Sequence, residues 1–352
     1  MNQESGLSNA VQHYRSHLLT WLFTGCFLIF GMVIVGGITR LTGSGLSITE
    51  WKVVTGTLPP LNEAQWVEEF EKYKQIPQYQ LVNAHFSLSD FKFIYFWEYI
   101  HRLFGRMIGF VFLGGLLFFL FKRAVPKKLL PRLLLMFALG GFQGFLGWYM
   151  VSSGLTQNVR VSHIRLAIHL TFAFITFGYI FWVALSELYN RETQNAERLK
   201  GYRNFVKGLF LLLILQIVYG AFVAGTKAGM IHNTWPTMDG AWVPESIGYA
   251  WEKDGWKSWI YNLPSIQFVH RGLAYLLVLI TGIFSWKILR SSLSVPQKNA
   301  VYFLLCGLFL QVVLGVITLL LQVPLWLGVM HQALGFMLFA GMVYLLHRLR
   351  YE

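Results

Sequence analysis

Four histidines within apolar segments carry the most specific chemical signal in this chain. His101, His169, His270 and His331 lie near the starts of alternate hydrophobic stretches. An imidazole inside a membrane is costly and needs a partner, and two imidazoles on facing helices can bind haem iron axially. The alternative is that each histidine only forms a hydrogen bond across helices. Because the four recur in alternate segments, the pattern predicts two bis-histidine haem sites.

The composition indicates a membrane protein. Hydrophobic residues make up 55% of the 352 residues and charged residues 13%, with a mean hydropathy of +0.50. Soluble domains are much more polar. We predict an all-α integral membrane protein with eight transmembrane helices, arranged as two pseudo-repeated four-helix bundles. The predicted spans are residues 18–37, 93–121, 133–152, 163–186, 205–225, 263–286, 300–321 and 326–346.

The net charge of +13 follows the predicted topology and does not indicate nucleic acid binding. If the eight helices alternate in direction, most connecting lysines and arginines lie on the same side as the two termini. By the positive-inside rule this side is the cytoplasm. The first residues lack the features of a cleaved signal or transit peptide, so we expect a bacterial inner (plasma) membrane. The four histidines then lie near the outer face.

The two halves of the chain resemble each other, and this resemblance predicts how the histidines pair. The matching segments are Glu98-Tyr99-Ile100-His101-Arg102 with Gln267-Phe268-Val269-His270-Arg271, Gln143 and Gly147 with Gln311 and Gly315, and Ile168-His169 with Met330-His331. We therefore divide the chain into residues 1–190, which form spans one to four, and residues 191–352, which form spans five to eight. His101 should pair with His169, and His270 with His331.

Small and basic residues next to the histidines suit a porphyrin. The residues one helical turn further on are all small: Gly105, Ala173, Ala274 and Gly335. They would leave room for a macrocycle on the same helix face. Arg102 and Arg271 directly follow their histidines and could bind haem propionates. The alternative for these arginines is snorkelling to lipid headgroups.

One acidic residue makes the two halves chemically different. Glu98 precedes His101 by three residues and shares its helix face, whereas the corresponding Gln267 cannot ionise. A carboxylate there could move protons, orient water or stabilise a cation. The alternative is a surface salt bridge with Arg102, four residues further on. We interpret the difference as chemistry in the first half and a permanently held haem in the second.

Two segments rich in glycine and proline follow the first and fifth spans. They run from Gly37 to Ser47 and from Asn233 to Gly240, and we expect them to form tight loops over a pocket at the outer face. A short interfacial helix should follow the first loop. Asn62 is its expected N-cap, and Trp66, Phe70 and Tyr73 form its apolar stripe.

Together these motifs resemble the haem A synthase family. The resemblance rests on Glu98-x-x-His101-Arg102, His169, His270-Arg271 and His331, on Gly-x-Thr-Arg-Leu-Thr-x-Ser-Gly-Leu-Ser from Gly37, and on Asn-Thr-Trp-Pro-x-Met-Asp-Gly from Asn233. It covers nearly the whole chain. Some bacterial members carry a cysteine pair in the first outer loop. The two cysteines here, Cys26 and Cys306, lie elsewhere, so the chain is similar to the cysteine-free branch that includes mitochondrial relatives.

The resemblance implies oxidation of the C8 methyl of haem O to the formyl group of haem A, through two hydroxylations, for use by terminal oxidases. It implies that His101 and His169 hold haem O, with Glu98 assisting by stabilising a carbocation, and that His270 and His331 hold haem b. An electron donor is required, and the sequence does not identify it. A partnership with haem O synthase fits the reaction, although no residue shows it.

Two other classes of protein fit part of the pattern. A di-haem membrane cytochrome b that exchanges electrons with quinone also needs paired histidines, but it does not require the difference between Glu98 and Gln267. A haem-free transporter built from repeats would place polar groups near the bilayer midplane. The predicted histidines lie near the outer face instead.

Overall fold

The structure is a computed structural model that describes residues 2–51, 58–155, 159–189, 191–193 and 197–351. Eight of its helices are long and apolar enough to cross a membrane. They are α1 (Asn2–Leu41), α3 (Leu88–Phe121), α4 (Leu130–Leu155), α5 (His163–Leu188), α6 (Lys200–Thr226), α9 (Leu263–Ile288), α10 (Val295–Leu320) and α11 (Leu325–Arg348). The predicted all-α membrane class and its eight spans are confirmed.

For seven of the helices, both the first and the last residue lie within five residues of the predicted span. For example, α3 begins at residue 88, and its span was predicted to begin at residue 93. The first turn of α3, which the prediction left out, contains polar residues. Ser87 and Asp90 form a capping box there, so the helix starts before the apolar run does. The exception is α1, which begins at Asn2, well before its apolar segment.

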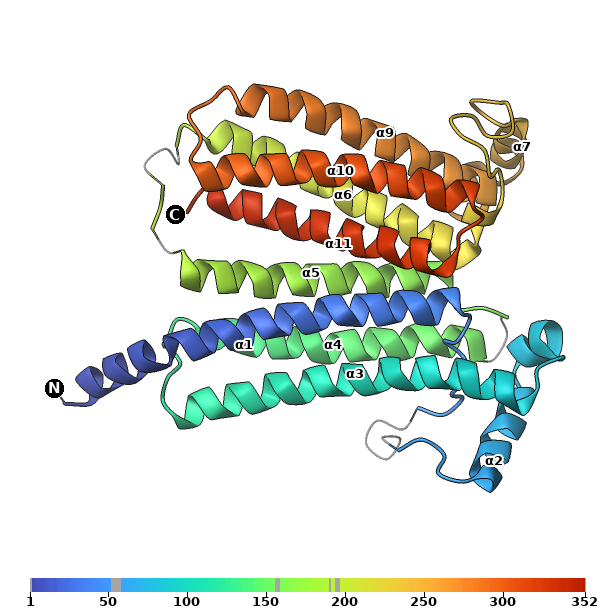
Figure 1. Cartoon of the computed structure of the whole chain (residues 1–352), viewed down its shortest axis with the longest axis horizontal. Coiled ribbons are helices and arrows are strands. Elements are labelled where there is room, and N and C mark those ends of the chain that lie inside the picture. The colour runs from blue at the N-terminus through green and yellow to red at the C-terminus, as the bar shows by residue number, and fades with distance from the viewer. Residues whose placement is uncertain (1, 52–57, 156–158, 190, 194–196, 352) are drawn as a thin grey trace.

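The eight helices form two groups of four that lie side by side (Figure 1). One group contains α1, α3, α4 and α5, and the other contains α6, α9, α10 and α11. Contacts of α5 with α6 and α11, and of α1 with α11, join the groups. The predicted half-bundles require this grouping. The internal repeat itself, and the boundary at residues 190 and 191, stay predictions, and residue 190 lies outside the described residues.

Aromatic packing and two polar contacts hold the groups together. The rings of Phe177 and Phe336 are 4.3 Å apart, in the largest buried cluster. Gln332 Nε2 donates to the Val33 carbonyl at 2.7 Å, which links α11 to α1. The Arg40 guanidinium donates to the Ala224 and Gly225 carbonyls at the end of α6. These bonds satisfy carbonyls that have no partner within α6.

The outer surface of the bundle is apolar. Large side chains such as Phe110, Phe121 and Phe309 are 70%, 84% and 69% exposed. In water such a surface would be unfavourable, but lipid chains cover it without cost. The hydrophobic exterior therefore agrees with eight membrane-spanning helices.

Both termini lie at one end of the bundle, and short helices cluster at the other (Figure 1). These include α2 (Glu63–Lys74), α7 (Glu245–Asp254) and α8 (Ser258–Tyr261). The predicted short helix is confirmed as α2, where the Asn62 side chain accepts a bond from Gln65 N at 3.0 Å, and its interfacial position stays a prediction. Phe70 and Tyr73 are buried as expected, and burial raises the pKa of Tyr73 to about 12. We call this end of the molecule the loop end.

Candidate functional site

All four histidines lie in the half of the bundle nearer the loop end. His169, His270 and His331 are within about two turns of the starts of α5, α9 and α11. His101 is further along its helix because α3 begins further out. All four side chains are half-buried.

The structure places the two histidines of each predicted pair within electrostatic range of each other, His101 with His169 and His270 with His331. The first pair lies on α3 and α5, and the second on α9 and α11. Each pair therefore belongs to one group of four helices.

Three of the histidines contact a glutamine of a neighbouring helix. The Nε2 of Gln143 on α4 is 3.2 Å from Nδ1 of His169. On α10, Gln311 Nε2 is 3.3 Å from Nε2 of His331. On α6, Gln216 Nε2 is 3.5 Å from Nε2 of His270. Sequence reasoning paired Gln143 with Gln311 but missed Gln216. The missed signal was a shared spacing, since a glycine follows each glutamine by four residues.

These glycines let the imidazoles pack against the neighbouring backbone. A Cβ atom at Gly147 would lie 3.2 Å from Cε1 of His169, and one at Gly315 would lie 2.8 Å from Cε1 of His331. At Gly220 the corresponding distance to His270 is 3.3 Å. A larger residue would push the ring aside, because protein interiors tolerate little added volume.

His101 has a different neighbour. It packs against Gly36 of α1, where an added Cβ would lie 3.3 Å from its Nε2. The residue one turn before Gly36 is Met32. In α4, α6 and α10 the residue one turn before the corresponding glycine is a glutamine.

The side chains suit haem iron and a porphyrin. Nδ1 of His270 and Nδ1 of His331 are buried and form no hydrogen bond with the described residues. A Cβ atom at Gly335 would meet Gln311 Nε2 at 3.4 Å, an ordinary contact, and one at Gly109 would meet nothing within 4 Å. A pair of imidazoles beside residues without bulk is a donor set that haem iron accepts.

Glu98 is buried, with 3% of its surface exposed, and both of its oxygens are engaged. Oε2 accepts bonds from Ser47 N at 2.7 Å, from Ser47 Oγ at 2.8 Å and from Ile48 N at 2.9 Å. Oε1 accepts from Arg102 Nε at 3.0 Å and from its terminal nitrogen at 2.7 Å. Sequence analysis offered the ion pair with Arg102 as an alternative at the surface. The structure contains this pair, but it is buried beneath the loop that follows α1.

Arg102 holds the same loop through backbone carbonyls. It donates to the carbonyls of Glu50 and Ile48, both at 2.9 Å, and it stacks over the Trp51 ring. Together with the bonds to Glu98, these interactions use four of the five guanidinium N–H groups. Among the described residues, one N–H group of Arg102 has no acceptor.

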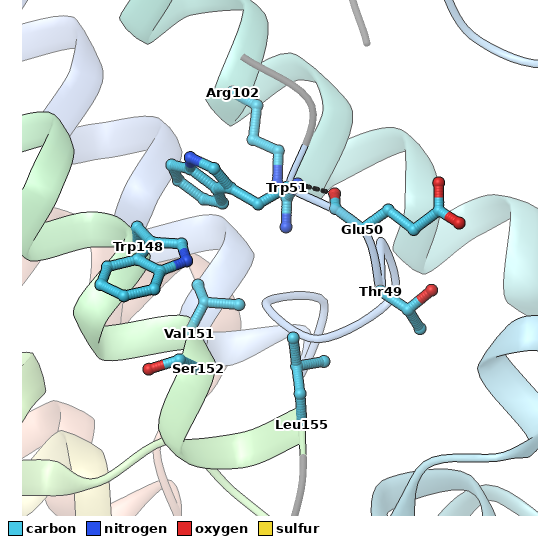
Figure 2. A pocket seen from close by; sticks show the side chains of 8 residues that line it. All are labelled: Thr49, Glu50, Trp51, Arg102, Trp148, Val151, Ser152 and Leu155. Carbon is cyan, nitrogen blue, oxygen red and sulfur yellow. Dashed lines mark hydrogen bonds between the residues drawn. The ribbon is translucent and has the colours of Figure 1, made fainter.

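A cavity of about 120 Å³ lies beside Arg102, between the first outer loop and α4 (Figure 2). Figure 2 shows Arg102 next to Trp51, and Trp148 on the neighbouring helix α4. Its lining residues are Thr49, Glu50, Trp51, Arg102, Trp148, Val151, Ser152 and Leu155. The guanidinium group that carries this N–H therefore belongs to a residue that lines the cavity.

In the second half of the chain, Arg271 and Gln267 bind the loop that follows α6. Arg271 donates to the carbonyls of His232, Thr234 and Thr237 at 2.7, 3.0 and 3.2 Å. Its Nε is buried without a partner among the described residues. Gln267 Nε2 donates to the Ile231 carbonyl at 2.7 Å.

The difference between Glu98 and Gln267 therefore matches the backbone groups that each side chain binds: N–H donors for Glu98 and a carbonyl acceptor for Gln267. Glu98 accepts bonds from two backbone N–H groups, so it needs oxygens. Gln267 donates to a backbone carbonyl, so it needs an N–H. The sequence predicted either a chemical role or a salt bridge with Arg102, but not the bonds to the loop backbone, because contacts between a loop and a helix about 50 residues away along the chain leave no local pattern.

The chain matches known proteins over nearly its whole length. A family model described as cytochrome oxidase assembly protein matches residues 19–343. A haem A synthase of Flavobacterium psychrophilum is 50% identical over 335 residues, which cover 94% of this chain and 97% of the relative. Haem A synthases of Flavobacterium johnsoniae and Parvibaculum lavamentivorans are 47% and 45% identical, and each match covers at least 94% of both proteins. The chain belongs to the cytochrome oxidase assembly protein family that these haem A synthases represent.

Proposed function

We propose that this protein oxidises haem O to haem A, the cofactor that terminal oxidases require. The observation that carries the proposal is the gathering of two histidine pairs, one in each group of four helices, in a chain that is 45–50% identical to haem A synthases. Conversion of a methyl to a formyl group is an oxidation, and it needs a source of oxygen and a partner that exchanges electrons.

His101 and His169 would hold haem O as substrate, and His270 and His331 would hold haem b. Haem iron supplies the redox chemistry of the oxidation when it is bound. The protein supplies the axial imidazoles and a fixed position for the macrocycle. Two features support propionate binding: the buried, unpartnered Nε of Arg271 and the remaining N–H of Arg102 beside the cavity.

We assign Glu98 to the substrate site as a fixed carboxylate. Its two oxygens accept hydrogen bonds from Arg102, Ser47 and Ile48, which hold the carboxylate in one orientation. This geometry favours a side chain that holds the loop and keeps its negative charge on the helix face that it shares with His101. A carbocation at the oxidised carbon would be stabilised by such a charge.

We place the protein in the bacterial inner membrane, with the histidine pairs near the outer face. The support is the excess of lysine and arginine at the end of the bundle that carries both termini. Haem O reaches the membrane from the enzyme that makes it, so a direct partnership with haem O synthase would spare this apolar substrate a passage through water. The electron donor is a further partner.

The direct test is extraction and mass analysis of haems from cells that make haem O but lack their own haem A synthase. Expression of this protein should yield a formyl-bearing haem, and expression of His101→Ala should not. For His270→Ala we expect loss of the resident haem b. Absence of haem A from cells that contain the folded wild-type protein would refute the proposed function.

A further inference from the structure

Gln143 and Gln311 contact their histidines in the same way: the side-chain amide nitrogen lies close to both the backbone carbonyl and the imidazole ring of the histidine. Gln143 Nε2 donates to the backbone carbonyl of His169 at 3.1 Å and lies 3.2 Å from its ring. Gln311 Nε2 donates to the backbone carbonyl of His331 at 3.0 Å and lies 3.3 Å from its ring. A carbonyl only accepts hydrogen bonds, so in this structure the nitrogen of each amide, and not its oxygen, faces the histidine carbonyl.

The other atom of each amide has no partner. Oε1 of Gln143, Gln216 and Gln311 is buried and accepts no hydrogen bond from the described residues. A buried polar atom without a partner costs about 1–3 kcal/mol, so such atoms are rare in folded proteins. Nδ1 of His270 and Nδ1 of His331 have no partner either. In two of the three places an unpaired acceptor and an unpaired ring nitrogen therefore lie on side chains that touch each other.

We propose that Gln143, Gln216 and Gln311 are positioning residues that accept a hydrogen bond from the axial histidine beside them. The inference rests on the proposed function, because it needs Nε2 of each imidazole to bind haem iron. The proton of the neutral ring is then on Nδ1, and haem-binding and metal-binding histidines almost always donate it to an acceptor. In this structure Nε2 of His270 and Nε2 of His331 lie beside the glutamine Nε2. A turn of each ring that directs Nε2 to iron and Nδ1–H to Oε1 of the glutamine would satisfy both atoms that have no partner among the described residues.

The glycines complete these three sites. Gly147, Gly220 and Gly315 each follow their glutamine by one turn, on the same helix face, and each lies against Cε1 of the same histidine. The glutamine would fix the ring by a hydrogen bond, and the glycine would limit its position by contact. We call each combination a Gln-Gly cradle.

His101 has no such cradle, because Met32 occupies the place of the glutamine. A thioether is at most a weak acceptor. The proposed haem b site therefore has two supported ligands, His270 and His331, and the proposed substrate site has one, His169. This difference suits a haem that stays in one site and a haem that must enter and leave the other.

The test uses Gln216→Met and Gln311→Met in the purified holoprotein, since methionine is the residue found beside His101. The measurements are the midpoint potential of haem b, the electron paramagnetic resonance spectrum of its ferric form, and the rate of haem loss. An accepted hydrogen bond makes imidazole a stronger donor, so its removal should raise the potential, change the g values and weaken haem retention by roughly 10- to 100-fold. Gln332→Met is the matched control, because Gln332 adjoins His331 but donates to Val33 instead of the ring.

A second substitution separates this role from a merely structural one. Gln311→Glu keeps an acceptor and strengthens it, so the potential should shift downward, opposite to Gln311→Met, even if the methionine variant binds haem poorly. Potentials and spectra that match wild type in the methionine variants, or equal shifts in the Met and Glu variants, would overturn the inference alone. A folded wild-type protein without any low-spin haem would overturn the proposed function as well.

Discussion

Replacement of Glu98 by glutamine should strongly lower haem A formation while the bundle and haem b remain. The side chain is 3% exposed and that of Arg102 is 10% exposed, so solvent screens their interaction very little. Removal of one partner of a buried ion pair costs about 3–5 kcal/mol. Glutamine also turns an N–H₂ group either toward Arg102 or toward the donors of Ser47 and Ile48. Even about 3 kcal/mol corresponds to a roughly 100-fold smaller equilibrium constant for the bonded arrangement of the loop on Glu98 and Arg102.

The assay is the ratio of haem A to haem O in pigments extracted from cells that make haem O. We expect this ratio to fall by at least about tenfold in Glu98→Gln, with haem b unchanged. Glu71→Gln is the matched control, since Glu71 forms an exposed ion pair with Lys74 at the same end of the molecule. Arg102→Gln leaves the carboxylate in place; a similar loss there would assign the effect to the loop. Normal conversion of haem O by Glu98→Gln would refute this reasoning.

Further substitutions test other parts of the account. Arg271→Gln removes bonds to three loop carbonyls and should lower both haem b content and the melting temperature in detergent; an unchanged haem content would argue against a role in propionate binding. Gly315→Ala places a Cβ 2.8 Å from His331 and should cost about 1–3 kcal/mol and weaken haem b binding. Gly272→Ala meets nothing within 4 Å and should leave the absorption spectrum as in wild type. Arg40→Gln should destabilise the contact between the two helix groups by about 1–3 kcal/mol, measured by thermal unfolding; equal stability would show that the bonds to α6 are dispensable.

The helices could be predicted from the sequence because their signals are local, and the histidine pairs because the two halves of the chain resemble each other. A run of apolar residues long enough to cross the bilayer marks a span, and the recurrence of His101, His169, His270 and His331 at corresponding places indicates how they pair. The capping residues Asn62 and Ser87 also act within one turn. Polar helix ends were missed where hydropathy alone defined the boundary, as at the start of α1.

Contacts between distant segments could not be predicted in the same way. Nothing near Glu98 in the sequence shows that the backbone of Ser47 and Ile48 folds onto it. Arg102 follows a histidine in both the propionate and the loop interpretation, and only the structure shows its bonds to loop carbonyls. Gln216 was within reach of sequence reasoning, because its spacing to Gly220 repeats that of the other two glutamine and glycine pairs.

The central claim is that the two histidine pairs hold different haems, and site-resolved haem content tests it most directly. Wild-type protein, His169→Ala and His331→Ala would be purified from cells that make haem O, and their haems extracted and identified by mass. The account predicts haem b together with haem O or haem A in the wild type, loss of haem O and haem A alone in His169→Ala, and loss of haem b alone in His331→Ala. Loss of the same haem from both folded variants would contradict it.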